Sequence, residues 1–409
     1  MESARLHLQT LTPARRQLRV AIVTETYPPE VNGVAMTTGR IVDGLLARGH
    51  EVQLVRPRQN PSDQPTPGEG FDEMLSIGIP LPKYNHLKMG LPARHALIRA
   101  WGLRRPDVVQ VVTEGPLGWS AVAAARKLKL PVITEFHTNF HSYSRYYGVG
   151  WLKQPLAAWL RRFHNKGDLC LTPTEALRAE LMADGYARVA VVARGVDGAL
   201  FSPARRSEAL RASWGVAADA PVCAIVSRLA PEKNLALGVR AFDAFLAREP
   251  RARLLFVGDG PARAALQAQH PQHIFAGMRS GEDLAAHYAS ADCFIFPSLT
   301  ETFGNVITEA LASGLPVLGF DYAAAAEVLR DGHNGLVVPY GDEAAFLAAA
   351  ARLGEDAGLR AVMQANARPS VLHVDWQVVL GQLEQQLNQV IEAHRHRAAG
   401  RGALGLAVD

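Results

Sequence analysis

The feature that most constrains this chain is a repeated alternation of short apolar runs with helical patterns. In the first half of the chain the apolar runs occupy residues 18–25, 50–57, 106–112, 130–137, 168–173 and 188–195. A second series follows at residues 220–228, 252–260, 273–278, 292–298, 315–321 and 335–339. Strands that alternate with helices in this way are typical of βαβ units. The sequence therefore predicts an α/β fold with two Rossmann-like domains, each containing a doubly wound parallel sheet.

The length of the chain also favours two hydrophobic cores, because 409 residues exceed the usual size of one. We expect a first domain at 1–202, a second at 203–374, and a final segment at 375–409. This segment is predicted to carry an amphipathic helix at about 375–396, which crosses back to the first domain, and a disordered tail, HRHRAAGRGALGLAVD. Within the first domain we expect a helix at about 37–48 and, from its Pro, Gly and Asp, an exposed loop at 59–80.

The composition narrows the class of protein. No apolar run approaches the roughly 18 residues that cross a bilayer, and the N-terminus lacks the apolar region of a secretory signal. Cys170, Cys223 and Cys293 lie far apart without metal-binding or redox spacing, so we expect core cysteines in a reducing compartment. These features predict a cytoplasmic protein.

The clearest chemical signal is the stretch FPSLTETFGNVITEALASGLPVL at 296–318. A strand is expected to end at Pro297, and Glu301 then precedes a helix on which Glu309 lies about two turns along. Free amides at a helix start attract phosphate, and Gly304 lets a phosphate approach the backbone. The two carboxylates can accept hydrogen bonds from sugar hydroxyls. The alternative is a helix-entry carboxylate at Glu301 and a solvent-exposed one at Glu309.

A pair of cations, Arg228 and Lys233, follows the first strand of the second domain in SRLAPEKN. Two cations at the carboxyl end of a strand suit a diphosphate, and they can stabilise it as a leaving group without a metal. The alternative is a solvated basic loop. The sequence contains no Asp-x-Asp motif and no His/Cys cluster with ligand spacing, so we expect neither a metal nor a cofactor.

Two signals lie in the first domain. Asn32 and Gly33 come just before the first expected helix, where backbone amides can face a phosphate, but the G-x-G-x-x-G spacing of a dinucleotide site is missing. His137 ends a strand and can face a donor sugar across the cleft between the domains, with His141 nearby. The alternative is a structural or exposed histidine.

In this order the four segments resemble the retaining GT-B glycosyltransferases of the family-four type, over nearly the whole chain. The resemblance implies that Arg228 and Lys233 grip the donor diphosphate beside Gly33. It further implies that Glu309 binds the nucleotide ribose, that Glu301 and His137 contact the transferred sugar, and that Arg279 contacts the base. Backbone amides after Thr302, at Phe303 and Gly304, would cap the phosphate. One departure is DYAAAAEVL at 321–329, where many members carry a glycine pair before the Glu327 position.

The basic charge of the chain is concentrated in its first half. Residues 1–200 contain 25 Lys and Arg against 17 Asp and Glu, whereas residues 201–409 contain 18 against 22. Two windows, 74–106 and 136–167, lack acids and mix cations with aromatic and aliphatic residues, a pattern that suits an anionic membrane surface. The alternative is that their apolar residues are core and their cations solvated. No nucleic-acid motif accompanies these windows.

The stretch HTNFHSYSRYYGVGWL at 137–152 also resembles bacterial mannosyl-, glucuronosyl- and sulfoquinovosyl-lipid transferases. We therefore expect a retaining, metal-independent hexosyltransferase that uses GDP-mannose or a UDP-sugar, acts on a membrane lipid, and sits peripherally on the inner face of the cell membrane. The alternatives are a polysaccharide or lipid-linked oligosaccharide acceptor, a GT-B epimerase or hydrolase, and a non-catalytic membrane scaffold. The sequence predicts no oligomeric state.

Overall fold

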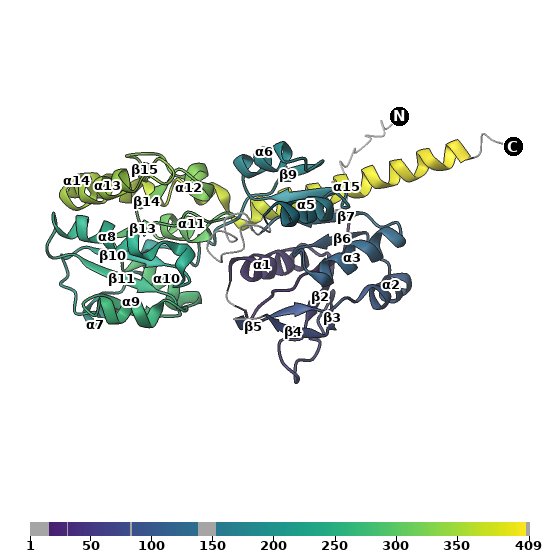
Figure 1. Cartoon of the computed structure of the whole chain (residues 1–409), viewed down its shortest axis with the longest axis horizontal. Coiled ribbons are helices and arrows are strands. Elements are labelled where there is room, and N and C mark those ends of the chain that lie inside the picture. Colours follow the sequence, from purple (N-terminus) through teal and green to yellow (C-terminus); the bar gives the residue numbers. More distant parts are fainter. Residues whose placement is uncertain (1–15, 31, 82–83, 138–152, 406–409) are drawn as a thin grey trace, which may run out of the picture.

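The computed structural model describes residues 16–30, 32–81, 84–137 and 153–405, and Figure 1 shows two α/β domains lying side by side. The predicted fold class is confirmed, since each predicted apolar run contains a strand of a parallel sheet. The first sheet has seven strands in the order β3-β2-β1-β6-β7-β8-β9. They span β1 Arg19–Val23, β2 Glu51–Pro57, β3 Phe71–Ser76, β6 Val108–Val111, β7 Val132–Glu135, β8 Leu169–Thr172 and β9 Val189–Val191.

Helices cover both faces of this first sheet. They are α1 Gly33–Ala47, α2 Arg94–Leu103, α3 Pro116–Lys127, α5 Lys153–His164 and α6 Glu175–Ala183, and a hairpin of β4 Gly78–Leu81 and β5 Tyr84–Gly90 adds a separate antiparallel pair. One core cluster lies between the sheet and α1, and a second lies on the opposite face with α2, α3 and α5. Because the strands are parallel, their carboxyl ends meet at one edge of the sheet, which is where ligands bind in such folds.

The second sheet has six parallel strands in the order β12-β11-β10-β13-β14-β15. They span β10 Val222–Val226, β11 Arg253–Val257, β12 Ile274–Gly277, β13 Cys293–Phe296, β14 Val317–Phe320 and β15 Gly335–Val338. The helices are α7 Glu208–Ser213, α8 Leu235–Leu246, α9 Arg263–Gln269, α10 Gly281–Ala289, α11 Asn305–Ala312, α12 Ala323–Val328, α13 Glu343–Glu355 and α14 Ala357–Ala367. Strand β10 lies between β11 and β13, so the loops that follow β10 and β13 are neighbours.

The last helix, α15 Trp376–Gly405, returns to the first domain and completes its core. Leu380 occupies the space beside Gly44 on α1, where a Cβ atom would lie 2.2 Å from the leucine methyl, so only glycine permits this close approach. Arg48, the residue that ends α1 as its C-cap, pairs with Glu384 of α15 at 3.0 Å. The chain passes between the two domains twice, near Val196 and near Val374. These two segments contact each other where the Val196 amide donates to the Val374 carbonyl at 3.0 Å.

Three expectations about local structure are wrong. The expected loop at 59–80 contains β3 and part of the β4–β5 hairpin, because Asp72 and Glu73 of β3 find partners in Gln53 and Arg56 of β2. The first helix begins at Gly33 rather than near residue 37, since the Asn32 side chain accepts from the Ala35 amide and caps it. The tail expected to be disordered from 394 onward is helical as far as Gly405.

Candidate functional site

The two motifs of the second domain meet at the carboxyl edge of its sheet. Lys233 lies in the short 3-10 helix Pro231–Lys233 after β10, and Glu301 lies in the loop between β13 and α11. The Lys233 Nζ and Glu301 Oε1 atoms are 2.5 Å apart. The Thr300 hydroxyl also donates to the Glu232 carbonyl at 3.0 Å, which ties the two loops together. The structure thus brings together the cation motif and the paired-glutamate motif, which are 68 residues apart at this contact.

Arg228 is half-exposed at the same edge and forms an ion pair with the buried carboxylate of Glu232. The side chain of Arg228 is 37 % exposed, whereas that of Glu232 is 1 % exposed. The carboxylate therefore binds one terminal nitrogen, Nη2, of a side chain that still reaches solvent. Arg228 and Lys233 together place two positive charges at the carboxyl end of β10. That arrangement suits a diphosphate.

Helix α11 begins at this edge without a side-chain cap. Its N-cap residue, Gly304, has φ +100°, a left-handed conformation that favours glycine. Phe303 is buried in the core, so the backbone rather than the phenyl ring of this residue is available to a ligand. An uncapped helix start with exposed amides attracts anions.

Glu309 lies in the second turn of α11 and is largely buried. It accepts a hydrogen bond from the Tyr288 hydroxyl at 3.0 Å. The alternative interpretation, in which Glu309 is a solvent-exposed carboxylate, is therefore wrong. Burial raises the pKa of Glu309 to about 7, while Tyr288 and Arg40 act in the opposite direction. Because Arg40 belongs to α1, the first domain faces α11 here, as Figure 1 also shows.

Arg279 follows β12, at the same carboxyl edge. Its guanidinium donates to the Ala276 carbonyl at 2.7 Å and pairs with Asp283 at 3.0 Å. Its side chain remains 38 % exposed. The contact of Arg279 with the nucleotide base stays a prediction.

On the first domain, Gly33 forms the exposed first residue of α1. No atom lies within 4 Å of the position that a Cβ would take, apart from its chain neighbours, so a ligand can approach the backbone. Asn32 is occupied as the cap of α1 and donates to the Thr26 hydroxyl at 2.7 Å. Asn32 therefore shapes this turn, whereas Gly33 is the open position.

His137 lies on the predicted edge, but its ring is held inside the first domain. The Arg194 guanidinium can only donate, so Nδ1 of His137 accepts from it at 3.1 Å, and Nε2 lies 2.7 Å from Glu135 Oε2. Burial raises the pKa of the Glu135 carboxyl, but His137, Arg194 and Gln110 outweigh this and hold it at about 2. His141 lies outside the described residues.

The two domains touch at this point. The Thr302 hydroxyl donates to the backbone carbonyl of His137 at 2.5 Å, and the Glu175 amide at the start of α6 donates to Glu327 at 3.2 Å. Residues of both domains therefore line the candidate site. His137 and α1 lie on one side, and on the other side lie Thr302, Gly304, Lys233 and Glu301.

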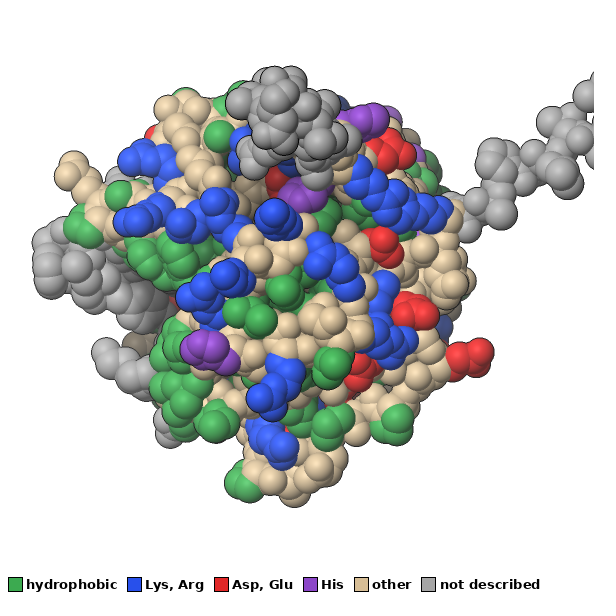
Figure 2. Space-filling view, turned by 90° about the vertical axis from the view of Figure 1, so that its right-hand side faces the viewer, with side chains coloured by type: hydrophobic (Ala, Val, Ile, Leu, Met, Phe, Trp, Pro, Cys, Tyr) green, Lys and Arg blue, Asp and Glu red, His purple; other side chains and the backbone are tan. Residues whose placement is uncertain are grey.

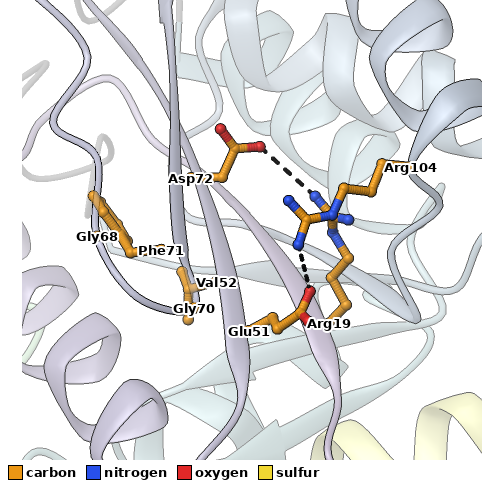
Figure 3. A pocket seen from close by; sticks show the side chains of 8 residues that line it. All are labelled: Arg19, Glu51, Val52, Gly68, Gly70, Phe71, Asp72 and Arg104. Carbon is orange, nitrogen blue, oxygen red and sulfur yellow. Dashed lines mark hydrogen bonds and ion pairs between the residues drawn. The ribbon is translucent and has the colours of Figure 1, made fainter.

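A pocket elsewhere in the first domain is a separate feature. It lies at the beginnings of β1, β2 and β3, the opposite edge from the site, and Figure 3 shows two ion pairs along its rim. Arg104 pairs with Glu51 at 2.9 Å, and Arg19 with Asp72 at 3.6 Å. Its charges are matched within the protein.

Comparison with known proteins decides the family. The model for Glycosyltransferase Family 4 matches residues 31–199, and the model for Glycosyl transferases group 1 matches residues 220–356. A GDP-mannose-dependent alpha-mannosyltransferase of Mycobacterium tuberculosis is 36% identical over 377 residues, which cover 90% of this chain and 95% of that protein. This chain is a family 4 glycosyltransferase.

Further relatives agree with this assignment. An alpha-monoglucosyldiacylglycerol synthase of Streptococcus pneumoniae is 29% identical to the transferase, over 74% of this chain and 70% of that protein. A sucrose-phosphate synthase from Thermosynechococcus elongatus superposes with a TM-score of 0.73 at 19% identity, over 92% of this chain and all of the other, which shows the same fold. The resemblance to GT-B glycosyltransferases of the family-four type, drawn from the sequence, is confirmed.

Sequence reasoning missed several residues of this transferase. Glu135 and Arg194 contact His137, Gln110 donates to Glu135, and Tyr288 contacts Glu309. None of these residues belongs to a recognisable motif. Glu135 lies in the apolar run 130–137, and a charged residue within an apolar strand was the available signal. Arg194 and Tyr288 come from other parts of the chain, and only the fold brings them to these positions.

Proposed function

We propose that this glycosyltransferase moves a hexosyl group from a nucleotide sugar, GDP-mannose or a UDP-hexose, to a glycerolipid at an anionic membrane surface. The observation that carries this proposal is the Lys233–Glu301 ion pair, which joins a diphosphate-binding cation to a carboxylate suited to sugar hydroxyls. The mannosyltransferase and glucosyldiacylglycerol synthase relatives support the donor and the acceptor class, respectively.

The chemistry follows from where charge develops. As the bond between the anomeric carbon and the donor phosphate breaks, negative charge grows on the diphosphate. Arg228, Lys233 and the amides of α11 can stabilise that charge without a metal. By resemblance to the family, the acceptor hydroxyl attacks the same face of the sugar, its proton passes to the departing phosphate, and the anomeric configuration is retained.

The outer end of the first domain supports a membrane acceptor. Figure 2 shows that Lys and Arg side chains predominate over acids on this face, with hydrophobic side chains between them. Arg94 and Arg99 of α2 and Arg162 of α5 are exposed, and so are Leu103 (86 %) and Trp159 (39 %). Such a surface suits peripheral binding on the inner face of the cell membrane.

The expectation for the two acid-free windows needs a correction. Leu97 and Trp101 of α2, and Leu160 and Phe163 of α5, are core residues, as the alternative had it. Within the first window, residues 78–81 and 84–90 form the antiparallel strands β4 and β5. Trp151 and the segment around it lie outside the described residues. Among the described residues, no helix has the length and apolar character of a bilayer-spanning segment.

The test combines donor and acceptor. Purified protein is incubated in EDTA with GDP-mannose, UDP-glucose or other UDP-hexoses and with anionic vesicles that contain diacylglycerol or phosphatidylinositol. We expect a glycolipid product whose anomeric proton shows the configuration of the donor. Release of free sugar without an acceptor would indicate a hydrolase instead. Vesicle binding without turnover, unchanged in Glu301→Ala, would indicate a scaffold.

A further inference from the structure

Tyr288 is a buried residue of α10 whose hydroxyl reaches the candidate nucleotide site. Its ring lies between Phe201 and Phe294, with centroid distances of 5.7 and 5.9 Å, and the side chain is fully buried. The hydroxyl donates to Glu309 Oε2 at 3.0 Å. A buried phenol requires a hydrogen-bond partner, and here that partner is the carboxylate of α11.

This hydrogen bond occupies one oxygen of Glu309 and fixes the orientation of the other. Among the described residues, no group donates to Glu309 Oε1. Since the Tyr288 ring is packed on both sides, the hydroxyl cannot follow the carboxylate into another rotamer. Tyr288 thus selects one orientation for a side chain that enters the site from the middle of a helix.

The same contact acts on the charge of Glu309. Burial raises the pKa of this carboxyl to about 7, and the two groups that oppose the rise are the Tyr288 hydroxyl on α10 and the Arg40 guanidinium on α1. Near neutral pH the carboxyl therefore divides between its protonated and ionised forms. An ionised carboxylate accepts hydrogen bonds from two adjacent hydroxyls, whereas a protonated one loses acceptor capacity.

We propose that Tyr288 is a positioning residue for the donor nucleotide, which holds Glu309 in the orientation and the ionised state that a ribose diol requires. This inference rests on the proposed function, in which Glu309 binds the ribose. It adds a residue of a different helix, and it makes nucleotide affinity depend on pH through a defined contact.

The experiment measures GDP binding by calorimetry between pH 6 and 9 for the wild type, Tyr288→Phe and Glu309→Gln. A nucleotide that lacks both ribose hydroxyls, 2′,3′-dideoxy-GDP, is the matched ligand, because its phosphates titrate like those of GDP. Tyr186→Phe is the matched protein control, since Tyr186 is also buried but lies in the first domain. Melting temperatures of the unliganded variants report folding.

We expect Tyr288→Phe to weaken GDP binding about fivefold to tenfold at pH 7, because the Glu309 carboxyl is then less often oriented and ionised for the ribose, and by less at pH 9. Its pH profile should move to higher pH. Binding of the dideoxy nucleotide should not change, and Glu309→Gln should remove the difference between the two nucleotides.

An equal loss at every pH, or an equal loss for both nucleotides, would overturn the positioning role and leave Tyr288 as a packing residue. A wild-type protein that binds no nucleotide would instead overturn the proposed function. If Tyr288→Phe does not fold, Glu309→Gln decides alone. A pH profile that persists without the Glu309 carboxylate would contradict the inference.

Discussion

The two halves of the candidate site are built differently, although each lies at the carboxyl edge of a parallel sheet. In the second domain, cations and carboxylates from separate loops form a connected set, in which Lys233 pairs with Glu301 and Arg228 with Glu232. Each of these pairs keeps at least one side chain that reaches solvent. In the first domain, Glu135 and Arg194 are both almost fully buried around His137.

This difference separates a surface prepared for a charged ligand from one whose charges are already satisfied. The second domain presents cations and an uncapped helix to the cleft, so an anionic donor gains interactions on binding. The first domain offers open backbone at Gly33, whereas the His137 carbonyl already accepts a hydrogen bond from Thr302. Its ion pairs are buried within the domain and do not face a ligand. Variants that break pairs in each half test whether this distinction holds.

Breaking the buried pair should have the largest effect on stability. Glu135→Gln leaves the Arg194 charge buried without its carboxylate, and we expect a loss of about 3–5 kcal/mol in the free energy of unfolding. Glu232→Gln should cost less, about 1–2 kcal/mol, because the Arg228 side chain is 37 % exposed and can be hydrated. Urea unfolding at pH 7 measures both, and equal losses would remove the distinction between the halves.

The stability that the buried Glu135 carboxylate contributes should depend on pH. The folded-state pKa of Glu135 is about 2, below its ordinary value of 4.5, so its contribution to stability is present above that value. The contribution should disappear as the pH falls from about 4.5 toward 2, and Glu135→Gln should remove this part of the profile. A variant with the acid limb of the wild type would contradict the assignment.

Loss of the ligand-facing pair should affect catalysis more than folding. Lys233→Ala or Glu301→Ala should each lower kcat/KM by about 10²–10³-fold, since each removes charge stabilisation or sugar contacts at the reacting centre. Because the two side chains touch, the double variant should lose less than the product of the single losses. Arg240→Ala, which breaks an exposed pair with Glu343, is the control and should leave kcat/KM unchanged. Additive losses would show that the two residues act separately.

The sequence predicted the second half of the site better than the first for a physical reason. Arg228, Lys233, Glu301 and Gly304 lie in loops directly after strands, so apolar periodicity followed by a polar turn locates them. Tyr288, Glu135 and Arg194 lie inside helices or strands, or next to them, where burial and partners come from tertiary packing. The series of apolar runs likewise predicted every strand of the two parallel sheets except β3. That strand carries Asp72 and Glu73, whose partners on β2 could not be inferred from spacing.

Membrane binding should depend on the first domain alone. Neutralising Arg94, Arg99 and Arg162 to Gln should weaken binding to anionic vesicles by about 1 kcal/mol per charge, or roughly fivefold each, and more at low salt. The control neutralises Arg240, Arg251 and Arg253, exposed cations of the second domain, and should leave vesicle binding unchanged. Co-sedimentation with vesicles measures this, and equal effects of the two sets would show that net charge, not the face in Figure 2, governs binding.

The smallest effect concerns the alanines at the start of α12, which depart from the glycine pair that the family resemblance leads us to expect there. Ala323 has φ +52°, the left-handed conformation that favours glycine, so the chain keeps this backbone and accepts the strain of a side chain. Ala323→Gly should therefore raise the free energy of unfolding by about 0.5–1 kcal/mol, whereas Ala326→Gly, at an exposed helical position, should lower it by about 1 kcal/mol. A gain confined to Ala323, with donor preference unchanged, would mean that the alanines preserve the geometry of this turn. A change in donor preference would instead place the Ala323 side chain against the transferred sugar.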